Sequence, residues 1–283
     1  MILSVCFASF HTGCNLIDPA EPIPALVKVN PVVLEVEPGQ GSARHKITEV
    51  WVSAEMNHIG VYRPGVTIPF QQLSAQTDFV FRPGIRNNGV LDDAIVYPLY
   101  TNYEAELQTV SGQITEVTPV FRYRPEAVFS FIEDFENSNQ FVENRDTIAG
   151  TMLIRSSDEP FEGAFSGEIL MTETNNYIEV THPITLVDLP TDGTAAYLEV
   201  HYKSEAAFGL GLIGIPLAGQ PVSNIFYVVF PSDEWNKLYL ELSDQLRLSD
   251  FPAYKIVINS LYPVGETDPE LRIQIDNLKV VHL

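Results

Sequence analysis

Apolar residues along this chain alternate with polar ones or form short runs, and turn residues interrupt them about every ten positions. The segment HKITEVWVSA, residues 45–54, is an example, with Ile47, Val50 and Val52 as the expected core residues. Sustained helical periodicity over a long segment is missing. The pattern therefore predicts an all-β chain.

The expected strands fall into two groups that meet near Pro125. Residues 25–125 are expected to form a first β-sandwich and residues 126–283 a second. The many short strands of the second group suit a jelly roll, in which two antiparallel sheets pack face to face. Because the joining segment is very short, we expect the two modules to pack against each other.

The negative net charge of the chain limits the classes of molecule that it can bind. The chain has 16 basic and 37 acidic side chains, a formal net charge of −21. Such a field repels nucleic acid and anionic lipid head groups, so we expect no nucleic-acid partner. It is compatible with cations, neutral glycans or a basic protein, and equally with a role in solubility alone.

The first residues, 1–14, form a short apolar run that contains no charged side chain and ends in Gly13-Cys14. The run is too short to span a bilayer, and it resembles the signal peptide and lipobox of bacterial lipoproteins. The resemblance implies a signal peptide over residues 1–13, a covalent lipid on Cys14, and a proline-rich tether over residues 14–24. The alternative is a buried apolar N-terminus in which Cys14 is a free thiol.

Two stretches of the first module carry a resemblance. Residues 47–69, with Ile59-Gly-Val-Tyr62 and Ile68-Pro69, resemble small PEGA-like domains and Ig- or transthyretin-like sandwiches. Residues 82–89 followed by 97–100 resemble a group of Bacteroidota outer-membrane lipoproteins. Glycine and asparagine in residues 84–89 permit left-handed backbone, so this loop is interpreted either as a recognition surface or as a plain tight turn. The binding residues under the first interpretation are Arg82, Arg86, Asn87 and Asn88.

The second module resembles galactose-binding-like jelly rolls, the fold of many carbohydrate-binding modules. The residues that carry this resemblance are the stretches 131–136, 164–168, 234–237 and 275–281. It implies a structural Ca²⁺ between Glu136 in the first strand and Asp276 in the last, because Ca²⁺ prefers carboxylate and carbonyl oxygens. The alternative is a pair of hydrogen-bonded acids without metal.

Glycan sites in such modules are aromatic platforms. The second module offers several aromatic side chains, most of which must be core residues. Alternation along a strand would put Phe226 and Tyr227 on opposite faces, and Tyr227 is the candidate that we select for ligand binding. The aromatic residues considered are Tyr177, Tyr197, Tyr202, Phe208, Phe226, Tyr227, Tyr239 and Tyr254.

Motifs for catalysis are missing, since the chain has no Gly-x-Ser-x-Gly elbow, His-Glu-x-x-His helix or phosphate-binding glycine loop. The sequence therefore favours a non-enzymatic, lipid-anchored accessory or scaffolding subunit of an outer-membrane protein complex. The first alternative is a cell-surface glycan-binding lipoprotein. A weaker one is a glycoside hydrolase, which needs only two carboxylates. Asp146-Thr147-Ile148 matches a short Bacteroidota glycosylation pattern, which makes Thr147 a candidate glycan acceptor.

Overall fold

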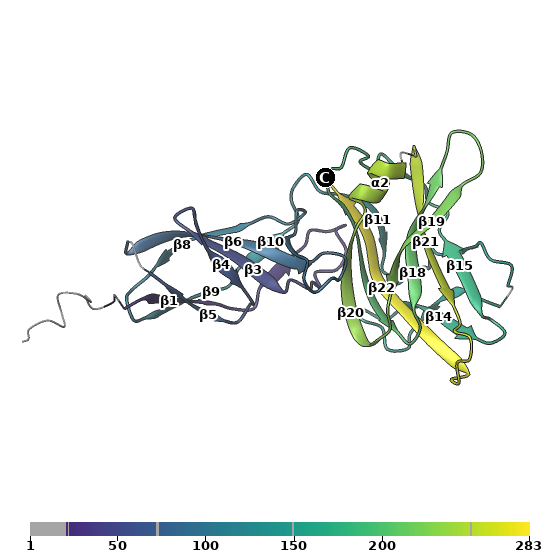
Figure 1. Ribbon diagram of the computed structural model, residues 1–283, viewed down its shortest axis with the longest axis horizontal. Helices are drawn as coiled ribbons and strands as arrows, with labels where there is room; N and C mark the ends of the chain where they lie inside the picture. The colour runs from purple at the N-terminus through teal and green to yellow at the C-terminus, as the bar shows by residue number, and fades with distance from the viewer. Residues whose placement is uncertain (1–20, 22, 72–73, 149, 250) are drawn as a thin grey trace, which may run out of the picture.

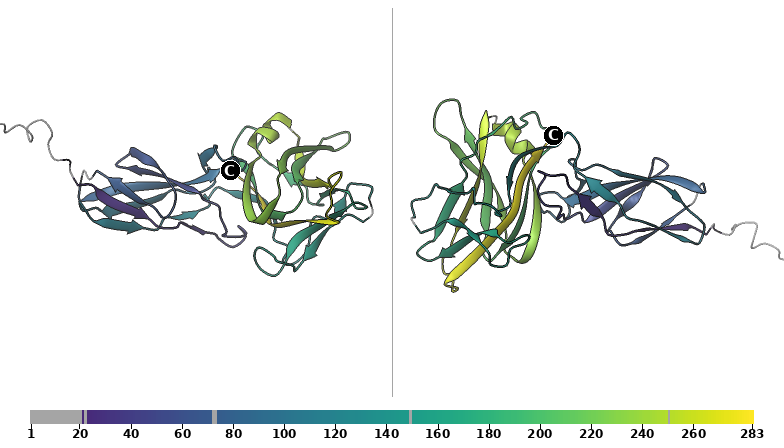
Figure 2. Two further views of the ribbon diagram at one scale, coloured as in Figure 1. Left: turned by 60° about the horizontal axis from the view of Figure 1, so that its bottom comes forward. Right: turned by 180° about the vertical axis from the view of Figure 1, so that it is seen from behind.

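The computed structural model describes residues 21, 23–71, 74–148, 150–249 and 251–283. These residues form 22 strands and one short helix, α2 (Ser243–Ser249), which confirms the predicted all-β class. None of the described helical residues makes a segment long and apolar enough to cross a membrane. Two β-sandwich modules lie end to end (Figures 1 and 2).

The first module contains strands β1 to β10, which form three sheets around one core. The expected core residues Ile47, Val50 and Val52 are all buried there, as predicted. The chain enters this module at the end opposite to the second module (Figure 1). The sheets are β5 (Thr67–Phe70), β1 (Ala25–Val29) and β9 (Ile114–Val117); β2 (Val33–Glu35) and β10 (Val120–Arg122); and β4 (Asn57–Tyr62), β3 (Glu49–Ala54), β6 (Gln76–Arg86), β7 (Ala94–Val96) and β8 (Tyr103–Gln108).

The second module is a jelly roll of two six-stranded sheets packed face to face. We call the sheet nearer to the first module the joint sheet and the other the distal sheet (Figure 1). The joint sheet contains β11 (Val128–Glu133), β13 (Leu153–Ser156), β14 (Ser166–Thr172), β22 (Glu270–His282), β17 (Ala196–Ser204) and β20 (Ser232–Glu241). The distal sheet contains β12 (Glu143–Asn144), β15 (Tyr177–Thr181), β16 (Leu186–Val187), β21 (Ala253–Leu261), β18 (Phe208–Ile215) and β19 (Val222–Val229).

Strand β6 extends further than the sequence indicates. Pro83 and Gly84 look like a turn in the sequence, but they continue the strand, where they pair with Val50 and Glu49 of β3. A Cβ atom on Gly84 would lie 3.0 Å from the Glu49 Cβ, so the close approach of the two strands requires glycine. The first half of the predicted 82–89 loop is therefore strand, and only its end is a turn.

The two modules meet over the outer face of the joint sheet. Tyr197, Tyr239 and Val281 of the jelly roll belong to the same hydrophobic cluster as the core of the first module. Tyr97 of the first module packs edge-on against Tyr197, with 4.9 Å between the ring centroids. Its ring is also 5.0 Å from that of Tyr239. The expectation that the modules pack against each other is met by a buried aromatic contact.

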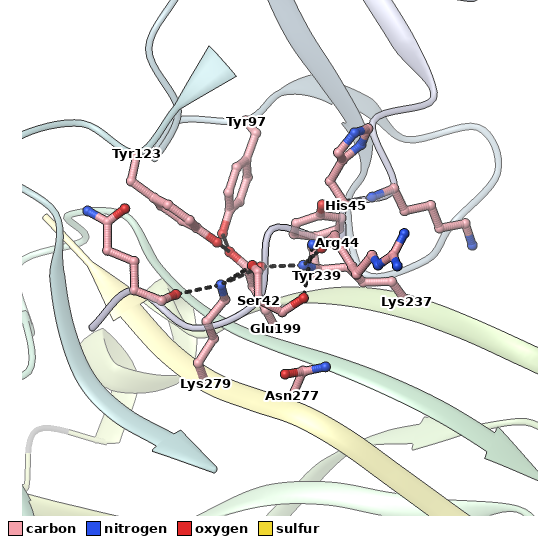
Figure 3. Close-up of polar contacts among 12 residues, drawn as sticks. Ser42, Arg44, His45, Tyr97, Tyr123, Glu199, Lys237, Tyr239, Asn277 and Lys279 are labelled. Atoms are coloured by element: carbon pink, nitrogen blue, oxygen red, sulfur yellow. Dashed lines mark hydrogen bonds and ion pairs between the residues drawn. The ribbon is translucent and has the colours of Figure 1, made fainter. Parts of the chain in front are cut away.

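A buried carboxylate lies at the centre of this joint (Figure 3). Glu199 is fully buried, and its Oε1 accepts hydrogen bonds from the hydroxyls of Tyr97 at 2.8 Å and Tyr123 at 2.7 Å. Its Oε2 lies 2.7 Å from the Lys237 Nζ and 3.9 Å from the Lys279 Nζ. Burial alone would raise the pKa of Glu199, but the two lysines outweigh it and hold this pKa at about 2.

The same lysines hold a strap of the first module, residues 40–46. The Lys237 Nζ donates to the carbonyl of Arg44 at 2.8 Å, and the Lys279 Nζ donates to that of Gln40 at 3.0 Å (Figure 3). Burial lowers the pKa of Lys279 to about 8. Backbone carbonyls and one shared carboxylate thus satisfy two cations that water does not reach, and they fix the two modules relative to each other.

Replacing Glu199 by Gln leaves Lys237 and Lys279 buried without a counter-charge. We expect the free energy of unfolding to fall by about 3–5 kcal/mol, the usual cost of breaking a buried ion pair. Denaturant titration of the full chain measures this change. The matched control is Glu35→Gln, which breaks an exposed pair with Arg122 and should cost less than about 1 kcal/mol. A loss for Glu199→Gln as small as the control's would contradict the role of Glu199.

Candidate functional site

The distal sheet has a face that points away from the jelly-roll core and from the first module (Figure 1). Cross-strand register defines which side chains share it, because directly paired residues point to the same side. Tyr177 pairs with Leu261 at one end of the sheet, and Glu179 pairs with Asn259 in the next row. We call this end of the outer surface, built from β15, β21 and the end of β19, the Tyr177 face.

A polar network holds the ring of Tyr177 in place. The Tyr177 hydroxyl donates to Glu179 Oε2 at 3.0 Å, so the side chain leans along its own strand. Glu179 Oε1 accepts from the Arg145 Nε at 3.0 Å, and the Glu179 backbone N–H donates to Asp146 Oδ2 at 3.1 Å. Burial, with Glu179 as the next cause, raises the pKa of Tyr177, so the hydroxyl keeps its proton at neutral pH. The result is a half-buried aromatic ring with hydrogen-bonding groups along one edge.

Apolar side chains continue the row that begins at Tyr177. Leu261 is 60% exposed and Phe230 is 74% exposed. Ser260 and Val229 both pair with Phe208 in one cross-strand row, and both are buried. Leu261 and Phe230 are the next residues of their chain segments, so alternation along a strand turns both toward the outer side. Leu261 is the direct neighbour of Tyr177, whereas Phe230 lies beyond strand β18 in the same row. Tyr177 and Leu261 thus form a small apolar surface that faces solvent, and Phe230 extends its row to the edge of the sheet.

The middle of the distal sheet is closed. Ile213 and Val257 on its outer side are at most 1% exposed. A Cβ atom on Gly209 would lie 2.1 Å from Asn259 Oδ1 and 2.6 Å from the Ile225 Cγ2, so these two side chains fill the space above the glycine. A ligand on this sheet therefore has access to the end that carries Tyr177, not to its centre.

Negative charge concentrates in the jelly roll. Residues 126–283 carry 25 acidic and 8 basic side chains, which is −17 of the chain's −21. The two cations of the distal sheet's outer side are both paired, Arg145 with Glu179 and Lys255 with Glu143 at 2.6 Å. The Tyr177 face therefore repels anionic ligands and accepts neutral ones.

The arginines of the 82–89 segment have partners within their own module. The Arg82 Nη1 donates to the Ser53 hydroxyl at 2.9 Å. Arg86 forms an ion pair with Glu49, which is itself buried. Their assignment to an external partner stays a prediction.

The asparagines of the same segment lie in the joint. Asn87 Nδ2 donates to Glu241 Oε2 at 3.0 Å, and the Asn88 N–H donates to the Tyr239 carbonyl at 2.9 Å. Tyr227 is the binding residue that the sequence predicts in the second module, and its hydroxyl donates a hydrogen bond to the Asn88 carbonyl. The structure thus brings together three of the five predicted binding residues, and it uses them first to attach one module to the other.

Alternation gave the wrong placement for Phe226 and Tyr227. A β-bulge interrupts the pairing of β18 and β19 between Leu210 and Gly211, so Phe226 has no partner across the ladder. Both rings pack against the jelly-roll core instead of pointing to opposite faces.

Glu136 and Asp276, the predicted calcium ligands, bind backbone amides. Glu136 Oε1 accepts from the N–H groups of Ala164 and Phe165, at 2.9 and 3.0 Å. Asp276 accepts from Glu162 N–H at 3.1 Å with one oxygen and from Asn277 N–H at 2.7 Å with the other. Burial is the main cause that raises the pKa of Asp276 to about 7.

This donor set as arranged does not fit Ca²⁺, which needs six to eight oxygen ligands. Three of the four carboxylate oxygens would have to release or share an N–H donor. Within the part of the chain that the structure describes, no group of three or more His, Cys, Asp or Glu side chains is arranged to hold a metal. The calcium site stays a prediction that the geometry does not favour.

The remaining predicted residues are Thr147 and Cys14. Thr147 is exposed in the loop after β12, beside Asp146 of the Tyr177 network. Its glycosylation stays a prediction. Cys14 lies outside the described residues, and so do the predicted signal peptide and most of the tether.

Comparison with known proteins finds no matching family model and no matching curated relative. Among solved structures, the tandem CBM22-1–CBM22-2 domains of Paenibacillus barcinonensis Xyn10C are similar over 92% of this chain and 77% of theirs, with 10% identity and a TM-score of 0.39. The CBM22-1 xylan-binding domain of the same enzyme covers 55% of this chain and 95% of its own, with 12% identity and a TM-score of 0.38. The family 30 carbohydrate-binding module of Clostridium thermocellum cellulase Cel9D-Cel44B covers 54% of this chain and 96% of its own, with 15% identity and a TM-score of 0.37. The case for function therefore rests on the chain's own residues.

In the sequence, Tyr177 is one of several aromatic residues of the second module and does not stand out among them. The spacing of Tyr177 and Glu179 was an available signal, because residues two apart on a strand share a face. Arg145, Asn259 and Leu261 join them only through strand pairing and loop placement, which no local pattern encodes.

We expect Asp276 to make the free energy of unfolding depend on pH. The folded-state pKa, about 7, lies above the ordinary value of 3.8. Folding therefore favours the protonated acid, and its contribution is complete below the ordinary pKa and is lost as pH rises toward 7. As pH rises between these values, we expect the unmodified chain to lose free energy of unfolding, because Asp276 ionises. The Asp276→Asn variant lacks this acid, so its free energy of unfolding, measured by denaturant titration, should rise relative to that of the unmodified chain. A difference between the two proteins that is constant with pH would contradict this.

The calcium prediction is tested on the same pair of proteins. A Ca²⁺ bound by Asp276 would keep it ionised and raise the melting temperature at neutral pH, and a chelator would reverse the rise. The Asp276→Asn variant should lose that response. A melting temperature of the unmodified chain that neither Ca²⁺ nor chelator moves would exclude the site.

Proposed function

We propose that this protein is a non-enzymatic, lipid-anchored glycan-binding protein of the cell surface, and that the jelly roll binds a neutral polysaccharide on the Tyr177 face. The observation that carries the proposal is the Tyr177 ring, fixed by Glu179 and continued by exposed Leu261 and Phe230. In this proposal the ring stacks on the apolar face of a sugar, and Arg145, Glu179 and Asn259 hydrogen-bond to its hydroxyls.

The chemistry of a sugar ring suits this arrangement. One side of a pyranose presents C–H groups, which pack on an aromatic face, while its hydroxyls need directional donors and acceptors. Holding the ring with a hydrogen bond in advance reduces the entropy that binding would otherwise cost. The net charge of the module supports a neutral ligand over one that bears carboxylate, sulfate or phosphate groups.

A scaffolding role in an outer-membrane assembly is the primary interpretation of the sequence, and it would use the surface between the modules and the 82–89 loop. Asn87 and Asn88 of that loop are engaged in the joint, and Arg86 is paired within its module. The loop therefore offers little to a protein partner, while the Tyr177 face remains open. This contrast supports the glycan-binding proposal over the scaffolding one.

Tyr177→Ala removes the ring at the centre of the proposed face. We expect affinity for the bound polysaccharide to fall at least about tenfold, as for an aromatic residue that dominates an interface. Affinity gel electrophoresis with xylan, hydroxyethyl cellulose, mannan and polygalacturonate measures this, and at least one neutral polymer should retard the unmodified chain while polygalacturonate does not.

Two controls define the role of the ring. Tyr177→Phe keeps the stacking surface and should retain most of the affinity, whereas Met56→Ala removes an exposed apolar side chain of the first module and should change nothing. If no polymer retards the unmodified chain, or if Tyr177→Ala migrates as the unmodified chain does, the proposal is wrong.

The proposed lipid anchor on Cys14 is tested separately. Cys14→Ala removes the thiol that would carry the lipid, so we expect the full-length protein to move from the membrane fraction to the soluble fraction of the cells that express it. Several acyl chains hold a protein firmly, because each buried CH₂ contributes about 0.8 kcal/mol. Immunoblotting of the two fractions is the measurement. A variant that stays in the membrane fraction would overturn the lipid anchor.

A further inference from the structure

A cavity lies where the two modules meet, at the open edge of the jelly roll. It has a volume of about 250 Å³ and lies between β19 and β20, the edge strands of the distal and joint sheets. Phe226, Tyr227 and Leu240 form its apolar wall, and Asp244 and Gln245 of helix α2 close one side. Asn88 of the first module also lines it, so the jelly roll alone does not complete the cavity.

The joint places Asn88 with little freedom. Its N–H donates to the Tyr239 carbonyl at 2.9 Å, and its Oδ1 accepts from the Glu241 N–H at 2.8 Å. The next residue, Gly89, has a φ of +68°, and a Cβ atom there would lie 3.0 Å from the Leu238 Cδ1. The backbone thus approaches the jelly roll closely because residue 89 is a glycine. The Asn88 carbonyl also accepts from the Tyr227 hydroxyl, so the bonds of the joint use its carbonyl, Oδ1 and N–H and leave its side-chain Nδ2 as a donor.

The polar groups around the cavity offer both donors and acceptors. One carboxylate oxygen of Glu241 accepts a hydrogen bond from Asn87 Nδ2 at 3.0 Å, and one of Asp244 pairs with the Arg247 guanidinium at 2.9 Å. One oxygen of each carboxylate therefore remains as an acceptor. Asn88 and Gln245 supply amide N–H donors. The set combines an aromatic wall with hydrogen-bonding groups of both kinds, as sites for small polar ligands usually do.

The size and charge of the cavity select the ligand. Its volume suits one ring-sized molecule rather than a polymer segment. Glu241 and Asp244 exclude a carboxylate or phosphate group by like-charge repulsion. A molecule with an apolar face and several hydroxyls, but no negative charge, satisfies both conditions.

We propose that this cavity binds a single uncharged sugar unit, and that binding requires both modules because Asn88 comes from the first and Phe226, Tyr227 and Gln245 from the second. The inference shares its ligand chemistry with the proposed function but uses none of the residues of the Tyr177 face. A ligand in the cavity touches both modules, so it binds the joined form more tightly than a separated one.

The test titrates the full chain, labelled with ¹⁵N, with D-glucose, D-xylose, D-galactose, D-mannose and N-acetyl-D-glucosamine, one at a time. At least one sugar should shift the amide signals of Asn88, Phe226 and Gln245 with a common saturation curve. In the Gln245→Ala variant the Kd of that sugar should rise at least tenfold. Gln113→Ala, an exposed glutamine of the first module outside the cavity, is the matched control and should leave the Kd unchanged.

A second variant separates this inference from the proposed function. Tyr177→Ala should leave the cavity shifts unchanged even if it abolishes retardation by polysaccharide. Cavity shifts that disappear in Tyr177→Ala but persist in Gln245→Ala would overturn the second site in favour of the Tyr177 face. The absence of any cavity shift with all five sugars would overturn the second site as well, whatever the result with polysaccharide.

Discussion

The arrangement of this molecule depends on one buried carboxylate. Glu199 projects from the outer face of the joint sheet and is satisfied from both modules, by Lys237 and Lys279 on its own side and by Tyr97 and Tyr123 on the other. Ions removed from water are costly unless every partner is in place, so this cluster favours the docked arrangement in which both modules supply their partners. The tyrosine contacts around it add apolar burial to the joint.

This joint decides which surfaces remain available. The first module covers the part of the joint sheet's outer face around Glu199, whereas the distal sheet faces away from the first module and from the end where the chain enters (Figure 1). Under the proposed function, the first module would be a spacer between the lipid anchor and the glycan-binding face. The same docking creates the cavity at Asn88, which neither module contains alone.

Charge and aromatic placement act together in the jelly roll. Its acidic side chains outnumber its basic ones three to one, and the cations of the distal sheet's outer side are neutralised by neighbouring carboxylates. What remains for recognition is an aromatic ring, exposed aliphatic groups and neutral or acidic hydrogen-bonding groups. Such a surface disfavours anionic ligands by charge repulsion, and among neutral ligands it favours those with a flat apolar face that fits the ring.

The sequence by itself determined the all-β class, the two sandwich modules, the acidic surface and the burial of Ile47, Val50 and Val52, because these follow from period-two patterning and composition. Only the tertiary structure decided what the functional candidates touch. Pro83-Gly84 continues a strand because β3 pairs with it, and Tyr227 turns toward Asn88 because a bulge breaks the alternation at Phe226. Tyr177 gains Arg145 and Leu261 only through distant strand pairing. Local patterns encode which side of a strand is buried, but they do not encode which distant residue arrives on the other side.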